Sequence, residues 1–363
     1  MKASSAETVL HNYISSPNNL QTSVSIVIPT YFRPTYLKLL LESVERMDYD
    51  LSRVEVIVVR DPADSDAQRA VEEFAERCRC KGVRVLVSEV NSASRKRNMG
   101  IVSASTNIVL VVDDDIVLNP ETLKRAVELL WDERVVAVGF PALSPNPSLS
   151  EKLHHGRFLG VVVRGVNTVM PVTAFKKDIL INYVGLYRED MGPPSTIHED
   201  WELGSRIRKA GFEVLVDGLT PQVHEPLINP DKEESASSSR SRIKVEGVLK
   251  YVKSYINKDW RTFFEVMRSS PLSQRLEYAF YFIAPWIFVA LLPLSPLHAV
   301  LYATALTSAT LLYSLLRRYY KMFSPADRVL YPLLLLLARI LRTNLSVVGY
   351  LKSLIVARIG GSS

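Results

Sequence analysis

The sequence has few cysteines and lacks the common signatures of zinc or nucleic-acid binding. Only two of its 363 residues are cysteines, in the segment Arg77-Cys78-Arg79-Cys80. Cysteines this close together are not expected to form an ordinary structural disulfide, and two are too few for a zinc site. Such sparse use of cysteine is typical of a reducing, cytosolic environment. Basic and aromatic residues are not interleaved, so nucleic acid is not an expected partner.

Other signals are missing as well. Residues 1–22 lack the apolar core of a signal peptide, and we expect them to form an N-terminal extension. Neither a G-x-G-x-x-G nor a Walker motif occurs, which argues against an NAD-type or P-loop nucleotide site. The net charge is only +6, a mild excess that suits an anionic ligand or an anionic membrane surface.

Strand and helix patterns alternate through the first part of the chain. Apolar, β-branched runs predict strands at 24–28, 54–59, 83–87 and 108–113, and helical spacing predicts helices at 34–46, 67–78 and 99–104. We interpret the polar, basic residues 91–98 as a connecting stretch. Further on, the patterns predict helices at 121–131 and 199–210 and strands at 135–139, 159–163, 169–172 and 214–216. This alternation predicts an α/β fold with a mostly parallel, Rossmann-like sheet.

The strand predicted at 108–113 runs into three adjacent carboxylates, Asp113, Asp114 and Asp115. Crowded negative charges repel one another, and a divalent cation with oxygen ligands is their natural partner. The carboxyl end of a strand is also where open α/β sheets bind ligands. An ordinary turn is the alternative, because Asp is common after strands. We interpret the cluster as a metal or phosphate site.

Three other predicted strands also end in polar residues. Pro29 and Thr30 follow the first strand, Asp61 follows the second and Asn91 follows the third. The carboxyl ends of parallel strands share one edge of a sheet, so this layout predicts a nucleotide site.

A second pair of acidic residues, Glu199 and Asp200, falls in the first turn of the helix predicted at 199–210. The positive end of the helix dipole favours negative charge there, so simple charge bias is the alternative to a functional role.

Five motifs, in order, resemble those of family 2 inverting glycosyltransferases with the GT-A fold. They are Ser25-Ile-Val-Ile-Pro-Thr-Tyr31, Val56-Ile-Val-Val-Arg-Asp61, Arg97-Asn-Met-Gly100, Val111-Val-Asp-Asp-Asp115 and His198-Glu-Asp-Trp-Glu-Leu-Gly-Ser-Arg206. The resemblance covers about residues 23–225.

The resemblance implies a role for each matching position. The implied donor-binding residues, for a UDP- or GDP-linked sugar, are Pro29, Thr30, Tyr31, Arg33, Asp61, Arg97, Asn98, Asp113 and Asp114. Asp113 and Asp115 would form the D-x-D pair, and together with His224 they would bind Mg²⁺ or Mn²⁺. Asp200 would be the general base, with Glu199 beside it. For His224 the alternative is a loop histidine that binds no metal.

Two departures from the family pattern affect these expectations. Arg60 stands where the family usually has the first of two acidic residues. No Gln-x-x-Arg-Trp motif follows the Glu-Asp pair, although processive synthases carry one. The second departure favours the addition of a single sugar.

The C-terminal part changes to long apolar segments. Tyr278–Leu294 and Leu297–Leu316 each approach the length of a membrane span, with Pro293 and Pro296 between them. We expect a transmembrane helical hairpin; two buried helices of a soluble bundle are the alternative. The basic segment Arg317-Arg-Tyr-Tyr-Lys321 then lies on the cytoplasmic side by the positive-inside rule.

The resemblance implies a GT-A catalytic domain at 23–230, with a nucleotide-binding half (23–118) and an acceptor half (119–230). After it, the sequence pattern predicts a linker with possible interfacial helices at 231–275, the hairpin at 276–317 and an amphipathic, membrane-interface helix at 325–359. An ordinary solvated helix is the alternative for residues 243–267.

The sequence therefore predicts a multi-pass protein of the cell membrane with a cytoplasmic catalytic domain. It would move one sugar from a nucleotide-sugar to a polyprenyl-phosphate or lipid-linked saccharide, with contacts to membrane lipids. The alternatives are a nucleotidyltransferase, an aspartyl-phosphate phosphatase and a non-catalytic membrane scaffold.

Overall fold

The computed structural model describes two parts of the chain. The first part consists of residues 22–225, except residues 146, 148–150, 152–154 and 192–198. The second part consists of residues 267–268, 270, 272–316, 336–337, 339–341, 343–352 and 355. The chain divides into two compact units, Met1–Ile228 and Asn229–Ser363. Nearly all of the predicted extension at 1–22 and most of the predicted linker at 231–275 lie outside the described residues.

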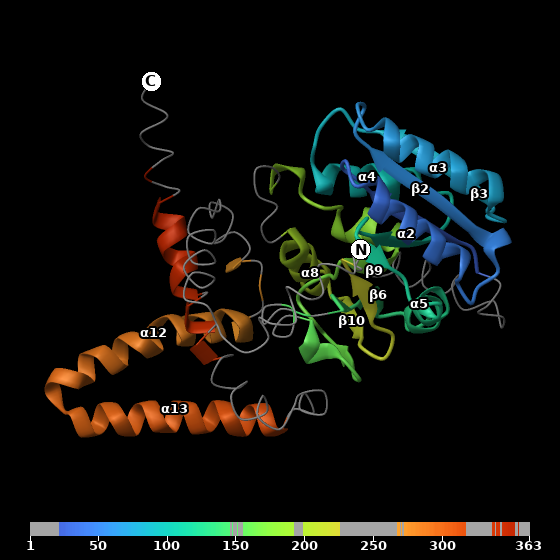
Figure 1. The fold of residues 1–363 in the computed structure, drawn as a ribbon. Helices are drawn as coiled ribbons and strands as arrows, with labels where there is room; N and C mark the ends of the chain where they lie inside the picture. Colours follow the sequence, from blue (N-terminus) through green and yellow to red (C-terminus); the bar gives the residue numbers. More distant parts are fainter. Residues whose placement is uncertain are drawn as a thin grey trace, which may run out of the picture. The chain divides into compact units, whose positions relative to one another are not determined.

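The N-terminal unit is built on an eight-stranded sheet with the order β3-β2-β1-β4-β9-β6-β10-β8 (Figure 1). The strands are β1 (Val24–Pro29), β2 (Val54–Arg60), β3 (Gly82–Val87), β4 (Ile108–Val112), β6 (Val135–Phe140), β8 (Val162–Arg164), β9 (Val172–Lys176) and β10 (Glu213–Asp217). β1 pairs in parallel with β2 and β4, β2 with β3, and β6 with β10. β9 runs antiparallel between β4 and β6, and β8 runs antiparallel to β10. The predicted α/β fold with a mostly parallel sheet is confirmed.

The strands are apolar on both faces because helices cover both faces. On β1, Ile26 and Ile28 join one hydrophobic cluster and Val27 joins the other. The first cluster includes residues of α2 (Pro34–Glu45), α3 (Ser65–Arg77) and α5 (Thr122–Leu130). The second includes residues of α4 (Ala93–Ser103) and α8 (Glu199–Lys209). The sheet is therefore the middle of three layers.

Helix α4 begins six residues earlier than the sequence pattern predicts, so the interpretation of 91–98 as a connecting stretch is wrong. The Ser92 side chain caps the helix by accepting a hydrogen bond from the Arg95 amide at 3.3 Å. The buried positions of this turn are polar and include Lys96, Arg97 and Asn98. A helix that buries charged residues shows no hydrophobic period, which is why the pattern misses it.

The strand predicted at 169–172 is also displaced, since β9 spans Val172–Lys176. Thr173 and Lys176 break the apolar run, but both are buried. The Thr173 hydroxyl donates to the Met170 carbonyl at 2.9 Å, and Lys176 Nζ donates to the Asp132 carbonyl at 2.8 Å. Because these buried polar side chains interrupt the apolar run, the sequence pattern does not reveal this central strand.

A second, three-stranded sheet has the order β5-β11-β7 and consists of β5 (Ile116–Val117), β11 (Gln222–His224) and β7 (Ala142–Leu143). β11 pairs antiparallel with β5, and this register places His224 opposite Ile116. The pairing brings residues more than a hundred positions apart in sequence to the end of β4.

The structure joins Cys78 and Cys80 in a disulfide, so the prediction that they form none is wrong. Cys78 lies at the end of α3 with extended backbone angles, φ −70° and ψ 135°. This conformation separates the two Cα atoms by 5.2 Å, within the usual range for a disulfide.

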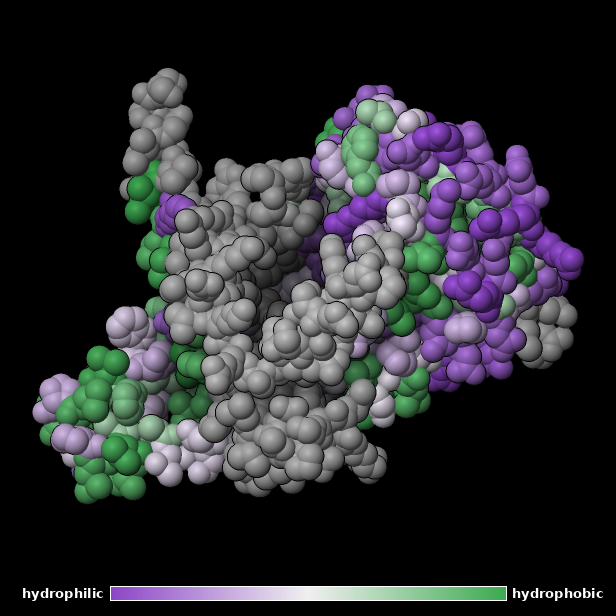
Figure 2. Space-filling model, viewed as in Figure 1, coloured by the Kyte–Doolittle hydropathy of each residue, from purple (hydrophilic) through white to green (hydrophobic). Residues whose placement is uncertain are grey.

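The C-terminal unit contains α12 (Leu272–Leu294) and α13 (Pro296–Leu316), with Ser295 between them. Of the described residues, one helical segment, Arg275–Leu294, has the length and composition of a membrane span. Figure 2 shows hydrophobic residues gathered over these helices. Residues 343–352 are helical, whereas much of the amphipathic helix predicted at 325–359 lies outside the described residues. The transmembrane hairpin stays a prediction.

Candidate functional site

The carboxyl ends of β1, β2 and β4 meet at one edge of the sheet because these strands are parallel neighbours. Asp114, the middle carboxylate after β4, is buried and accepts hydrogen bonds from the Thr30 hydroxyl at 2.7 Å and the Tyr31 amide at 3.3 Å. Burial raises the pKa of Asp114 to about 6. Asp114 therefore ties the loop after β1 to the loop after β4.

Arg33 contacts the same carboxylate cluster from the start of α2. Its Nη1 lies 2.6 Å from Asp115 Oδ2 and 3.4 Å from Asp114 Oδ1. The Asp115 side chain is 11% exposed, whereas that of Arg33 is 50% exposed. The arginine thus neutralises a nearly buried carboxylate while keeping access to solvent.

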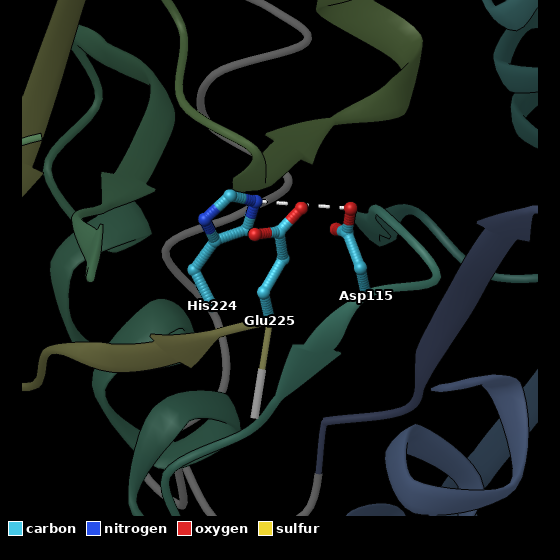
Figure 3. A group of neighbouring side chains, drawn as sticks. All are labelled: Asp115, His224 and Glu225. Atoms are coloured by element: carbon cyan, nitrogen blue, oxygen red, sulfur yellow. Dashed lines mark ion pairs between the residues drawn. The ribbon is translucent and has the colours of Figure 1, made fainter. Parts of the chain in front are cut away.

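Asp115, His224 and Glu225 point toward one another, with ligand atoms within 4.8 Å (Figure 3). His224 Nε2 lies 3.7 Å from Asp115 Oδ2, and this contact raises the pKa of His224 to about 9. Glu225 has a left-handed backbone, φ 42°, and its amide donates to the Asp115 carbonyl at 2.8 Å. A non-glycine residue held in that conformation is typical of a functional site.

This set of side chains fits a divalent cation. Carboxylates are the preferred ligands of Mg²⁺ and Mn²⁺, and an imidazole can complete such a site. A cation would also offset the negative charge of the two carboxylates. Asp115 and His224 were predicted as metal ligands, whereas the sequence gives no signal for Glu225. Asp113, the third predicted ligand, is not a member of this group and pairs with Arg97.

Arg97 links the end of β4 to the start of α8. Its Nη2 lies 2.7 Å from Asp113 Oδ1, and its Nη1 lies 3.4 Å from Glu199 Oε1. The guanidinium also lies over the Tyr187 ring, 5.4 Å from its centroid. Although burial opposes its charge, the surrounding carboxylates hold the pKa of Arg97 above its ordinary value. The buried guanidinium of Arg97 therefore connects the two acidic motifs of the sequence.

Asp200 lies beside this pair in the first turn of α8. Removal from bulk water raises the pKa of Asp200, the charge of Glu199 raises it further, and Arg97 opposes both effects. A carboxylate with a raised pKa is a better proton acceptor than an ordinary aspartate. This environment suits a general base.

The Asn98 side chain forms hydrogen bonds with other residues of the protein. Its amide nitrogen donates to the Tyr187 carbonyl at 2.8 Å and to Glu189 at 3.0 Å, and its oxygen accepts from the Tyr187 amide at 3.0 Å. Asn98 thus holds the segment that carries the ring stacked on Arg97. A direct contact with the donor stays a prediction.

Sequence reasoning missed Lys96 and Asp64, which shape the loop after β1. Lys96 Nζ donates to the Thr30 carbonyl at 2.7 Å and lies over the Tyr31 ring. Asp64 accepts from the Phe32 amide at 2.6 Å, which fixes Phe32 at φ 52°. Both residues are buried and charged, as is common at functional sites, but their burial follows from packing and leaves no signal in the sequence.

The remaining predicted donor-site residues line the same edge. Pro29 is buried at the end of β1, Tyr31 is 47% exposed, and Asp61 is half-buried after β2 with its carboxylate accepting from the Ala63 amide at 3.1 Å. Their roles toward a donor stay predictions.

Comparison with known proteins identifies a matching family and several similar proteins. Residues 25–183 match the family described as Glycosyl transferase family 2. Poly(ribitol-phosphate) beta-N-acetylglucosaminyltransferase TarS of Staphylococcus aureus (strain Mu50 / ATCC 700699) is 29% identical over 154 residues, 42% of this chain and 23% of that protein. The match thus spans about a quarter of the length of that relative.

Two solved structures align with most of the chain. Mannosyltransferase PcManGT from Pyrobaculum calidifontis, in complex with GDP-Man and Mn²⁺, is 16% identical with a TM-score of 0.52, covering 96% of this chain and 95% of that one. The crystal structure of S. aureus TarS 1–349 with UDP-GlcNAc is 17% identical with a TM-score of 0.49, covering 93% and 92%.

The fold is a GT-A-like α/β fold with a mostly parallel central sheet. Residues 25–183 form a domain that matches glycosyl transferase family 2. This domain match favours a glycosyltransferase over the nucleotidyltransferase and the phosphatase considered from the sequence.

Proposed function

We propose that this chain is a metal-assisted inverting glycosyltransferase that moves one sugar from a nucleotide-sugar to a membrane-associated acceptor. The observation that carries the proposal is the Asp113–Arg97–Glu199 link, which sets Asp200 beside the carboxylate-rich end of β4. A candidate base next to a cation-binding edge is what one-step glycosyl transfer from a diphosphate requires. The catalytic domain is proposed to comprise residues 23–230.

The donor side is proposed to be the edge formed by Thr30, Asp61 and Asp113, with the cation held by Asp115, His224 and Glu225. A divalent cation supplies charge neutralisation for a diphosphate leaving group. PcManGT, which shares the fold, is in complex with GDP-Man and Mn²⁺, and this supports a nucleotide-sugar and Mn²⁺ or Mg²⁺ here.

The acceptor step is proposed to use Asp200. The acceptor hydroxyl oxygen bonds to the anomeric carbon, the bond from that carbon to the diphosphate breaks, and the hydroxyl proton passes to the Asp200 carboxylate. Because this is a single displacement, the anomeric configuration inverts. The buried Arg97 and Glu199 hold the start of α8, which keeps Asp200 in place.

The acceptor is proposed to be a polyprenyl-phosphate or lipid-linked saccharide. Support comes from the apolar segment Arg275–Leu294, which has the composition of a membrane span. We propose a multi-pass membrane protein with its catalytic domain in the cytoplasm. TarS, by its name, acts on poly(ribitol-phosphate), so a phosphate-bearing acceptor is chemically consistent with the relative as well.

Thermal unfolding of the full chain in detergent tests the donor proposal. UDP- and GDP-sugars are added with and without Mn²⁺, and a ligand present at 100 times its Kd adds about 2.7 kcal/mol of stability. We expect at least one nucleotide-sugar to raise the Tm, and more so with Mn²⁺. If no nucleotide-sugar changes the Tm under either condition, the proposed function is wrong.

A further inference from the structure

Arg33 occupies a position that conflicts with a cation at the candidate metal site. Asp115 Oδ2, which lies 3.7 Å from His224 Nε2, also lies 2.6 Å from the Arg33 guanidinium. The same carboxylate oxygen therefore faces both the metal-ligand group and an arginine.

A guanidinium and a divalent cation repel each other when they share one carboxylate. At a separation of about 4 Å near the protein surface, this repulsion is well above thermal energy. Asp115 is nearly buried, whereas the Arg33 side chain is half exposed. When a cation binds, Arg33 is therefore the group that moves.

A diphosphate offers Arg33 a new partner. Arg33 is the residue before α2, and its loop begins at Thr30, at the end of β1. The planar guanidinium favours phosphate oxygens in bidentate geometry. A ligand that binds Arg33 away from Asp115 frees that carboxylate for the cation, and by reciprocity the cation strengthens binding of that ligand.

On the basis of the proposed function, we propose that Arg33 couples cation binding to donor binding. The Arg33 guanidinium pairs with Asp115 when the site is free, and it moves to the nucleoside diphosphate when the cation binds. Arg33 is thus a positioning residue, and tight binding of the cation depends on the presence of the donor. It prevents tight cation binding in the absence of a diphosphate.

The test measures Mn²⁺ binding to the full-length chain by electron paramagnetic resonance, with and without UDP or GDP. Wild type is compared with Arg33→Gln and with a control variant, Arg69→Gln. Arg69 is an arginine of α3 whose side chain is 68% exposed and pairs with Asp66. We expect a diphosphate to tighten Mn²⁺ binding by about fivefold or more in wild type and in Arg69→Gln. In Arg33→Gln, Mn²⁺ alone binds several-fold tighter and the tightening by diphosphate is largely lost.

An Arg33→Lys variant keeps the charge without the bidentate geometry, and we expect it to retain weak Mn²⁺ binding but to lose most of the coupling. Melting curves of the free proteins confirm that each variant folds. Equal Mn²⁺ affinity and equal coupling in Arg33→Gln and wild type overturn the role of Arg33 while leaving the proposed function intact. Wild type that binds neither Mn²⁺ nor a diphosphate overturns both.

Discussion

At the scale of residues, a few buried charges organise the site. Arg97 is 9% exposed and pairs with Asp113, which follows β4, and with Glu199 of α8. Sequence motifs predicted the acidic residues and Arg97, because clustered carboxylates at strand ends and helix starts are visible in the chain. They could not predict the Arg97–Glu199 pair or Glu225, because such contacts depend on how distant segments pack.

Loss of the Arg97 charge tests this buried link. We expect Arg97→Gln to lower the free energy of unfolding by about 3–5 kcal/mol, because two carboxylates lose a buried partner. Urea denaturation measures the change. Arg95→Gln, on the same helix but 47% exposed and 3.5 Å from Glu189, is the control and changes stability by less than about 1 kcal/mol. Equal effects of the two substitutions would show that Arg97 is not a structural link.

The raised pKa of Asp200 predicts a pH dependence. A general base acts when deprotonated, so kcat/KM rises with pH as Asp200 loses its proton. Because the protein raises this pKa, the rise falls above the ordinary aspartate value of about 4. Steady-state rates between pH 5 and 9 measure it. A profile that is already flat at pH 5 contradicts the assignment of Asp200 as base.

At the scale of elements, close backbone packing positions α8. Gly204 lies where an added Cβ would come within 2.6 Å of the backbone of Asn167 and Thr168. The helix pattern and its acidic first turn were predictable from sequence. The requirement for glycine was not, because nothing local indicates which segment lies against the helix.

We expect Gly204→Ala to lower the free energy of unfolding by about 1–3 kcal/mol and to reduce transfer, because α8 must move away from 167–168 and carries Asp200 with it. Gly82→Ala is the control, since a Cβ there meets nothing within 4 Å. Chemical denaturation and transfer rates measure both variants. If Gly204→Ala behaves like the control, α8 is not held by this contact.

At the scale of the whole molecule, the chain joins a three-layer α/β unit to a second unit whose described residues include the apolar helices α12 and α13. The mostly parallel sheet could be predicted from the alternation of strand and helix patterns, whereas the order of the strands in the sheet was not predicted. The small β5-β11-β7 sheet was not predicted either, because strands of two or three residues carry too little pattern to be recognised.

Membrane association is predicted for the full chain. We expect wild type to float with phospholipid vesicles, and a variant with Ile283→Asp and Val289→Asp to float less, because each charge in the span costs about 2.5–3.5 kcal/mol on insertion. Both positions are exposed on α12, at 49% and 54%. Val102→Asp, 57% exposed on α4, is the control. Wild type that remains in the soluble fraction contradicts the proposed membrane association.

The central claim is that one edge of the sheet binds a metal and a nucleotide-sugar while Asp200 activates the acceptor. The most direct measurement is the rate of sugar transfer, in the presence of Mn²⁺, from the nucleotide-sugar that the protein binds. It compares wild type with Asp115→Asn and Asp200→Asn, and Asp190→Asn is the control at an exposed position. We predict that Asp200→Asn still binds the donor but transfers about 10²–10⁴-fold more slowly. Asp115→Asn loses metal-dependent donor binding, and Asp190→Asn retains both. Full transfer activity in both Asp115→Asn and Asp200→Asn would contradict the account.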